Sequence, residues 1–241
     1  MSAAVVIGAG DATGGAIARA FARDGLTSCV NRRARNADTL EALAQSIRDQ
    51  GHQARAFPGD ARDEAAMIGL FDQVEAEVGP VEVAVFNIGA NVNFNIGETS
   101  AQVYRKVWEM ACFGGFLMGR EAAKRMEPRG RGTILFTGAT ASLRGGTGYA
   151  AFSGAKAALR MLAQSMAREL GPKGIHVAHI VIDGAIDTDF IKGRHSDFDA
   201  AKAADLILSP GAIAAQYVML HHQPKSAWTH ELDLRPWGEK F

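Results

Sequence analysis

Tyr149 and Lys156 are two side chains whose types and spacing could perform acid chemistry. They stand seven positions apart, close to two helical turns, so a helix that begins at Tyr149 projects both from one face. An unperturbed phenol has a pKa of about 10, and a neighbouring ammonium stabilises its anion, which makes the phenol a usable proton donor. The pair could therefore protonate an oxygen that gains negative charge in a reduction. The alternative interpretation is that Tyr149 is a helix-end residue that packs on a loop.

A second chemical feature is the turn Gly8-Ala9-Gly10-Asp11-Ala12-Thr13-Gly14-Gly15, which follows the apolar run 3–7. Glycines at such a junction let the backbone turn sharply and come close to a pyrophosphate, which then faces the N–H groups of the next helix. The position at the first strand-to-helix junction favours a dinucleotide site over a plain tight loop. A P-loop is excluded because no Lys-Ser or Lys-Thr follows the glycines.

Arg32 and Arg33 follow the next predicted strand, where dinucleotide folds select between two cofactors. An acidic residue there binds the ribose 2′-hydroxyl of NAD, whereas arginine accommodates the 2′-phosphate of NADP. No Asp or Glu occupies this strand end, and guanidinium groups form strong bidentate bonds with phosphate. The sequence therefore predicts NADP(H), and a solvated surface pair is the alternative.

Strands and helices must position these residues, and they are predicted from apolar runs that alternate with helical patterns along the chain. No linker or composition shift divides the chain, so we predict an α/β fold, a single doubly wound Rossmann-type domain over residues 1–241. The alternation specifies a parallel sheet flanked by helices, with right-handed crossovers. Strands are predicted at 3–7, 26–30, 53–57, 81–86, 132–136 and 175–182, and helices at 14–24, 40–50, 65–78, 101–126 (bent at Gly114-Gly115) and 149–170.

The order of the motifs resembles the short-chain dehydrogenase/reductase family from Val5 to about Asp233. The motifs are the glycine turn 8–14 with Ala12 in its middle place, Gly59-Asp60-Ala61 as an adenine-contacting element, Asn87-Ile88-Gly89 as a strand end, and Asp183-Gly184-Ala185-Ile186-Asp187-Thr188 as the loop that holds the nicotinamide amide. The turn, the strand end and the resemblance together give the expected cofactor-binding residues Gly8, Gly10, Asp11, Ala12, Thr13, Gly14, Arg32, Arg33, Asp60, Ala61, Asn87, Gly89, Lys156, Gly184, Ile186 and Thr188.

The sequence departs from the family's pattern at the catalytic residues. Only the family's lysine has a match, which is Lys156. Phe152 stands where the family usually has its tyrosine, Ala139 at its serine and Ala111 near its helix asparagine. Because Phe152 cannot donate a proton, Tyr149 becomes the candidate donor. The Tyr-x6-Lys spacing is similar to that of enoyl reductases in this superfamily, in which tyrosine stabilises an enolate oxygen and lysine holds the cofactor ribose.

The resemblance implies an NADP(H)-dependent oxidoreductase that transfers hydride to or from an activated C=C or C=O of a small apolar substrate. Tyr149 and Lys156 are the expected catalytic residues. Thr137, Thr140 and Ser142 could also donate to a substrate oxygen, or could be turn residues that bond their own backbone. The alternative function is that of a regulatory protein that binds the cofactor and has lost hydride transfer.

Residues 189–207 correspond to the family's substrate lid, and Phe190, Ile191 and Phe198 could form its apolar inner side. The resemblance also implies a homodimer or homotetramer built on the two long helices.

Charge and residue usage exclude several other classes of function. Twenty-six basic and twenty-six acidic residues give no net charge, so nucleic acid is not an expected partner. No membrane span and no signal peptide are predicted, and the two separated cysteines fit a reduced compartment, so a cytoplasmic location is expected. No metal site is predicted. His176 and His179 would face opposite sides of a strand, and His221-His222 adjoins a helix end, where a helix-dipole role outranks metal binding.

Overall fold

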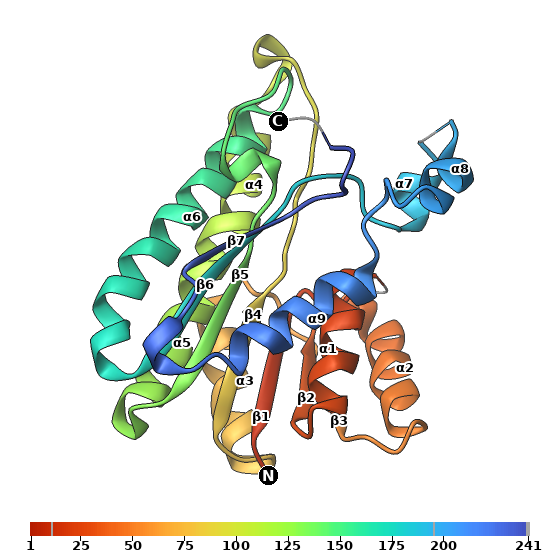
Figure 1. Ribbon diagram of the computed structural model, residues 1–241. Coiled ribbons are helices and arrows are strands. Elements are labelled where there is room, and N and C mark those ends of the chain that lie inside the picture. The colour runs from red at the N-terminus through yellow and green to blue at the C-terminus, as the bar shows by residue number, and fades with distance from the viewer. Residues whose placement is uncertain (11, 195, 240–241) are drawn as a thin grey trace.

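The computed structural model describes residues 1–10, 12–194 and 196–239, and a seven-stranded sheet runs through its centre (Figure 1). Every pair of neighbouring strands is parallel, and the order across the sheet is β3-β2-β1-β4-β5-β6-β7. The predicted doubly wound α/β fold is thereby confirmed. The strands are β1 (Ala3–Ile7), β2 (Thr27–Asn31), β3 (Ala54–Ala56), β4 (Val81–Phe86), β5 (Gly132–Thr137), β6 (Ile175–Ile182) and β7 (Glu231–Leu234).

Helices cover both faces of this sheet (Figure 1). On one face α1, α2 and α9 bury side chains such as Phe21, Leu40 and Tyr217, and on the other α3, α5 and α6 bury Phe71, Leu117 and Leu159, among others. The helices are α1 (Thr13–Arg23), α2 (Ala37–Arg48), α3 (Glu64–Glu77), α4 (Ala101–Trp108), α5 (Gly114–Met126), α6 (Ala150–Leu170), α7 (Asp189–Lys192), α8 (Phe198–Ala203) and α9 (Pro210–His221).

The order of the strands reverses at β1, which pairs with β2 on one side and with β4 on the other. All five residues of β1 are buried, as expected for a strand that has helices on both sides. In open parallel sheets, ligands bind beyond the carboxyl ends of the strands at such a reversal, because the connecting loops diverge there and leave a crevice.

The structure differs in detail from the predicted helix 101–126. A π-helical turn at Glu109–Phe113 interrupts the helix, so that α4 ends before the predicted bend and α5 begins at Gly114. Gly115 is required for packing rather than bending, since a Cβ there would lie 2.5 Å from Leu159 Cδ1 of α6. The sequence analysis placed a helix end beside His221-His222 without giving bounds for α9, and it missed β7 and, within the predicted lid, α7 and α8.

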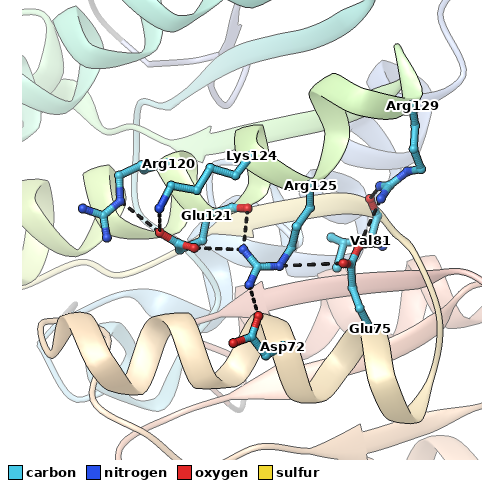
Figure 2. A network of polar contacts seen from close by, with 8 residues as sticks. All are labelled: Asp72, Glu75, Val81, Arg120, Glu121, Lys124, Arg125 and Arg129. Atoms are coloured by element: carbon cyan, nitrogen blue, oxygen red, sulfur yellow. Dashed lines mark hydrogen bonds and ion pairs between the residues drawn. The ribbon is translucent and has the colours of Figure 1, made fainter.

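A polar network joins α3 to α5 on one face of the molecule (Figure 2). Glu121 of α5, only 2% exposed, accepts hydrogen bonds from Arg120, Lys124 and Arg125. Arg125 also binds Asp72 of α3. The burial of Glu121 is therefore compensated by three cations, and the network fixes α5 against its neighbour.

Candidate active site

The turn between β1 and α1 is packed too closely at Gly8 and Gly14 to admit a side chain. Gly8 has φ +83°, and a Cβ at Gly14 would lie 2.3 Å from the carbonyl oxygen of Gly8. The Asn87 amide donates to that same oxygen at 3.2 Å and ties the end of β4 to the turn. Ala12, the N-cap of α1, supplies no side-chain cap. Asp11, which was also predicted to bind cofactor, lies outside the described residues.

The end of β2 holds the other side of this turn through Asn31. Its carbonyl oxygen accepts from the backbone N–H groups of Gly8 (3.0 Å) and Ala9 (3.1 Å). Its side-chain amide donates to the Phe57 carbonyl at 2.8 Å. Through these hydrogen bonds the buried Asn31 joins the ends of β1, β2 and β3. The sequence analysis missed this role because Asn31 has no charge and belongs to no motif.

Three arginines line a cavity of about 300 Å³ beside the turn. Arg32 and Arg33 were predicted at this place, and Arg35 joins them from the first turn that follows β2. The Arg32 guanidinium lies close to Gly10, 3.9 Å from where a Cβ would stand. The structure thus gathers positive charge at the predicted phosphate site.

Asp60 lines the same cavity with a partner that the sequence analysis did not foresee. Its carboxylate accepts from Arg62 Nε at 2.9 Å and from Arg62 Nη2 at 2.6 Å. Hydrogen bonding to Arg62 holds the pKa of Asp60 below its usual range. Asp60 therefore stays charged, and Arg62 adds a fourth guanidinium to the cavity wall.

A larger cavity of about 790 Å³ adjoins the first and shares with it Gly8, Gly10, Asn87 and Gly89. It lies at the carboxyl ends of β1, β4, β5 and β6. Every described residue predicted to bind cofactor lines one or both of the two cavities. Those of the larger cavity alone are Ala12, Thr13, Gly14, Lys156, Gly184, Ile186 and Thr188, and those of the smaller alone are Arg32, Arg33, Asp60 and Ala61.

Lys156 is 2% exposed and its ammonium points to the ends of two strands. Its Nζ donates to the carbonyl oxygens of Thr137 (2.7 Å) and Ile88 (3.0 Å). Burial lowers the pKa of Lys156 from the usual 10.5 to about 7. Lys156 lines the larger cavity, and its charge changes with pH near neutrality.

Tyr149 and Phe152 line the larger cavity together with Lys156. Tyr149 is the N-cap of α6 rather than its first residue, and it lines the cavity that Lys156 also lines. Phe152 is 7% exposed and belongs to an apolar cluster that also contains Ala111 and Ala139. The three residues that the sequence analysis expected at the family's tyrosine, serine and asparagine positions thus lie in one apolar cluster.

The other candidate hydroxyls near this surface are engaged within the protein. Thr137 shares a 2.7 Å hydrogen bond with Tyr217, and the Thr140 hydroxyl donates to the buried carboxylate of Asp183. The Ser142 hydroxyl accepts from a backbone N–H at 3.1 Å. Ser142 therefore makes the local backbone bond that was the alternative to catalysis, whereas Thr137 and Thr140 bond side chains from other elements.

The loop after β6 and the predicted lid close the other side of the larger cavity. The Thr188 hydroxyl accepts from the Ile191 N–H at 3.1 Å and caps α7. Phe190 and Ile191 line the cavity as predicted, whereas Phe198 is buried within its own segment and does not line it. The apolar inner side of this segment is therefore provided by α7.

The chain matches the short chain dehydrogenase family model over residues 2–198 and belongs to this family. It is 32% identical over 202 residues to cis-4-hydroxycyclohexanecarboxylate dehydrogenase of Sinomonas cyclohexanicum, an alignment that covers 83% of this chain and 80% of that protein. The relatives are named as dehydrogenases and reductases, so the chain is an oxidoreductase of short-chain dehydrogenase/reductase type.

Two solved structures support the same assignment. A short-chain dehydrogenase from Rhodopseudomonas palustris is 47% identical, with a TM-score of 0.84 and coverage of 98% of this chain and 99% of that one. A 7α-hydroxysteroid dehydrogenase in complex with NADH is 27% identical, with a TM-score of 0.88 and coverage of 98% and 94%. The family assignment therefore implies a nicotinamide nucleotide cofactor.

Among the helices of the described residues, none combines the length and the apolar character that crossing a bilayer requires.

Proposed function

We propose that this chain transfers hydride between NADP(H) and a C=O or activated C=C of a small substrate. The observation that carries the proposal is the continuity of the two cavities, with arginines at one end and the pair Tyr149 and Lys156 at the other. The residues present fit a dinucleotide, since the uncapped start of α1 and the arginine-lined cavity both favour phosphate. When bound, the cofactor supplies or accepts the hydride.

The chain's own residues would divide the work of binding along the two cavities. Arg32 and Arg33 would pair with a 2′-phosphate, and the glycine turn with α1 would face the pyrophosphate. Lys156, already aimed at the strand ends, would hold ribose hydroxyls, and Thr188 would hold the nicotinamide amide through its remaining O–H. The assignments of Lys156 and Thr188 rest on the family resemblance.

Tyr149 would supply the proton or stabilise the developing oxyanion. Phe152, which we infer stands at the family's tyrosine position, has no proton to give. A charged Lys156 near the same cavity would stabilise the Tyr149 phenolate. Ser153 is a second donor candidate that the sequence analysis missed, because its buried hydroxyl has no hydrogen-bond partner among the described residues and the residue lines the cavity.

The substrate we propose has an apolar body and an anionic end. Phe152, Phe190 and Ile191 form apolar wall, and Arg144, 49% exposed, is the cation other than Lys156 among the described lining residues. The buried carboxylate of Asp183 lies 4.0 Å from the Arg144 guanidinium and would orient it. The relative named for a hydroxycyclohexanecarboxylate supports this substrate class. The alternative of a non-catalytic regulatory protein is not favoured, because the relatives are named for catalysis.

We also propose that the chain forms a homo-oligomer in which the long helices make the contact between subunits. Trp108, Phe113 and Phe116 stack in a row with ring centroids 5.8 and 6.0 Å apart, and Trp108 and Phe116 are 40% and 38% exposed. A row of exposed rings of this kind supports a protein contact.

Titration of NADPH and NADH by protein fluorescence tests the cofactor assignment. Replacing both arginines (Arg32→Leu with Arg33→Leu) should weaken NADPH binding about 100-fold or more, since charge-assisted hydrogen bonds contribute about 1.5–3 kcal/mol each, and should leave NADH binding nearly unchanged. Arg131→Leu, on a 63% exposed arginine that pairs with Glu82, is the matched control. Tighter binding of NADH than of NADPH by the wild-type protein would overturn the assignment.

Tyr149→Phe tests the proposed chemistry. Turnover should fall about 100-fold or more while NADPH binds as tightly as before, because only the proton is lost. Ser153→Ala, made beside it, should retain turnover if Tyr149 is the donor. Unchanged turnover in Tyr149→Phe would remove this residue from the mechanism.

A further inference from the structure

Three side chains that can bind a metal converge where α1 and α9 end. Asp24 is the C-cap of α1, His221 is the last residue of α9 and His222 is its C-cap. One ligand atom from each of these residues lies within 4.8 Å of those from the other two. None of the three lines either cavity of the proposed active site. The cluster therefore needs an explanation of its own.

His221 is held in the orientation that a ligand requires. Its Nδ1 lies 2.9 Å from the Thr133 hydroxyl, and its ring packs edge-on against Phe21 with centroids 6.1 Å apart. A proton on Nδ1 shared with Thr133 leaves the lone pair on Nε2, and bonds of this kind fix the tautomer of metal-binding histidines.

His222 and Asp24 already face each other, and their exposure leaves them room to close on an ion. His222 Nε2 lies 2.8 Å from both carboxylate oxygens of Asp24, and the two side chains are 59% and 20% exposed. Zinc bonds of about 2.0–2.1 Å in a tetrahedral site place ligand atoms roughly 3.3 Å apart. Since all the ligand atoms lie within 4.8 Å of one another, closing the cluster on an ion needs movements of at most about 1.5 Å, which side-chain rotation supplies.

The backbone around the cluster favours a positive charge. Two helix C-termini meet there, those of the eleven-residue α1 and the twelve-residue α9, and each carries partial negative charge. Asp24 adds a full negative charge, and Glu82 acts on His221 from the neighbouring strand β4. A divalent cation would thus replace the proton between His222 and Asp24 in a favourable field.

We propose that Asp24, His221 and His222 bind one divalent transition-metal ion, with zinc as the best match to two imidazoles, one carboxylate and a water in the fourth position. Such an ion would join the ends of α1 and α9, which pack against each other, and so stabilise the fold without entering the hydride chemistry. The sequence analysis ranked a helix-end role above metal binding for His221 and His222, because the third ligand is almost the whole chain away in sequence.

Isothermal titration with zinc chloride of chelator-treated, full-length protein tests the proposal. We expect one zinc per chain, at least tenfold weaker binding in Asp24→Asn and in His222→Gln, and unchanged binding in His52→Gln, a histidine far from the cluster in sequence and outside it. At about 100 times the dissociation constant, zinc should raise the melting temperature of the wild type by about 5 °C.

The double variant Asp24→Asn with His222→Gln should lose both the stoichiometric zinc and this rise in melting temperature. Its circular dichroism and melting temperature without zinc would verify that it folds. Absence of wild-type binding at zinc concentrations up to about 1 mM, or equal binding by wild type and double variant, would overturn the proposal.

Discussion

Glu121 and Lys156 are both 2% exposed, yet their surroundings are opposite. The Glu121 carboxylate accepts from three cations on its own helix (Figure 2). The Lys156 ammonium meets only the carbonyl oxygens of Ile88 and Thr137, and no carboxylate forms an ion pair with it among the described residues.

The difference appears in their ionisation. Burial alone would raise the pKa of Glu121, but hydrogen bonds from Lys124, Arg125 and Arg120 outweigh it and hold that pKa below its usual range. Burial lowers the pKa of Lys156 to about 7 with no comparable compensation. Glu121 is buried among oppositely charged partners and so holds structural elements together. Lys156 is buried beside a cavity without a counter-ion, which is unfavourable for stability, and such groups occur most often at functional sites.

The largest expected effect is the loss of turnover in Lys156→Met. Turnover should fall about 100-fold or more, because the variant removes both the proposed ribose contact and the charge that stabilises the Tyr149 phenolate. Lys124→Met, a lysine-to-methionine change at a side chain that is 57% exposed on α5, is the matched control and should keep its activity. Steady-state kinetics with NADPH measures the contrast, and equal activity of the two variants would end the functional interpretation of Lys156.

Glu121→Gln should have the next largest effect, and on stability instead of turnover. We expect about 2 kcal/mol less free energy of unfolding, because three cations lose the negative charge that they share and one acceptor oxygen is replaced by an NH2 donor. Urea denaturation measures the loss, and kcat should match the wild type at a temperature where both are folded. A large drop in kcat without loss of stability would show that the network serves the active site.

Sequence reasoning predicted the parallel α/β fold and placed the glycine turn and Arg32 at strand ends, because these signals are local: glycines at a junction, charge at a strand end and apolar runs between them. It missed β7, whose four residues include two acidic ones and have no long apolar run. It missed Asn31 as a site residue and Asp24 as a partner of His222, because these contacts join chain segments that only the fold brings together. It also missed Arg62, although its partner Asp60 is only two residues away, because the short spacing does not show that both side chains line one cavity.

The pH dependence of stability is the sharpest test of the contrast, and within one pH unit it is also the smallest effect. The pKa of Lys156 is about 7 in the folded protein and 10.5 as its ordinary value. Between these values the unfolded chain holds more protons than the folded one, so Lys156 makes the free energy of unfolding rise with pH, by at most about 1.4 kcal/mol per pH unit. Below pH 7 both states are protonated and this contribution to the slope disappears.

Urea denaturation of wild type and Lys156→Met from pH 7 to 9.5 isolates this contribution, because every other titrating group is common to both proteins. The wild type should gain stability relative to the variant across this window. Glu121→Gln should instead run parallel to the wild type there, since the pKa of Glu121 lies below its usual acidic value and the carboxylate is charged in both states. If Lys156→Met also ran parallel, the folded protein would hold Lys156 at an ordinary pKa, and the physical distinction between the two buried charges would be lost.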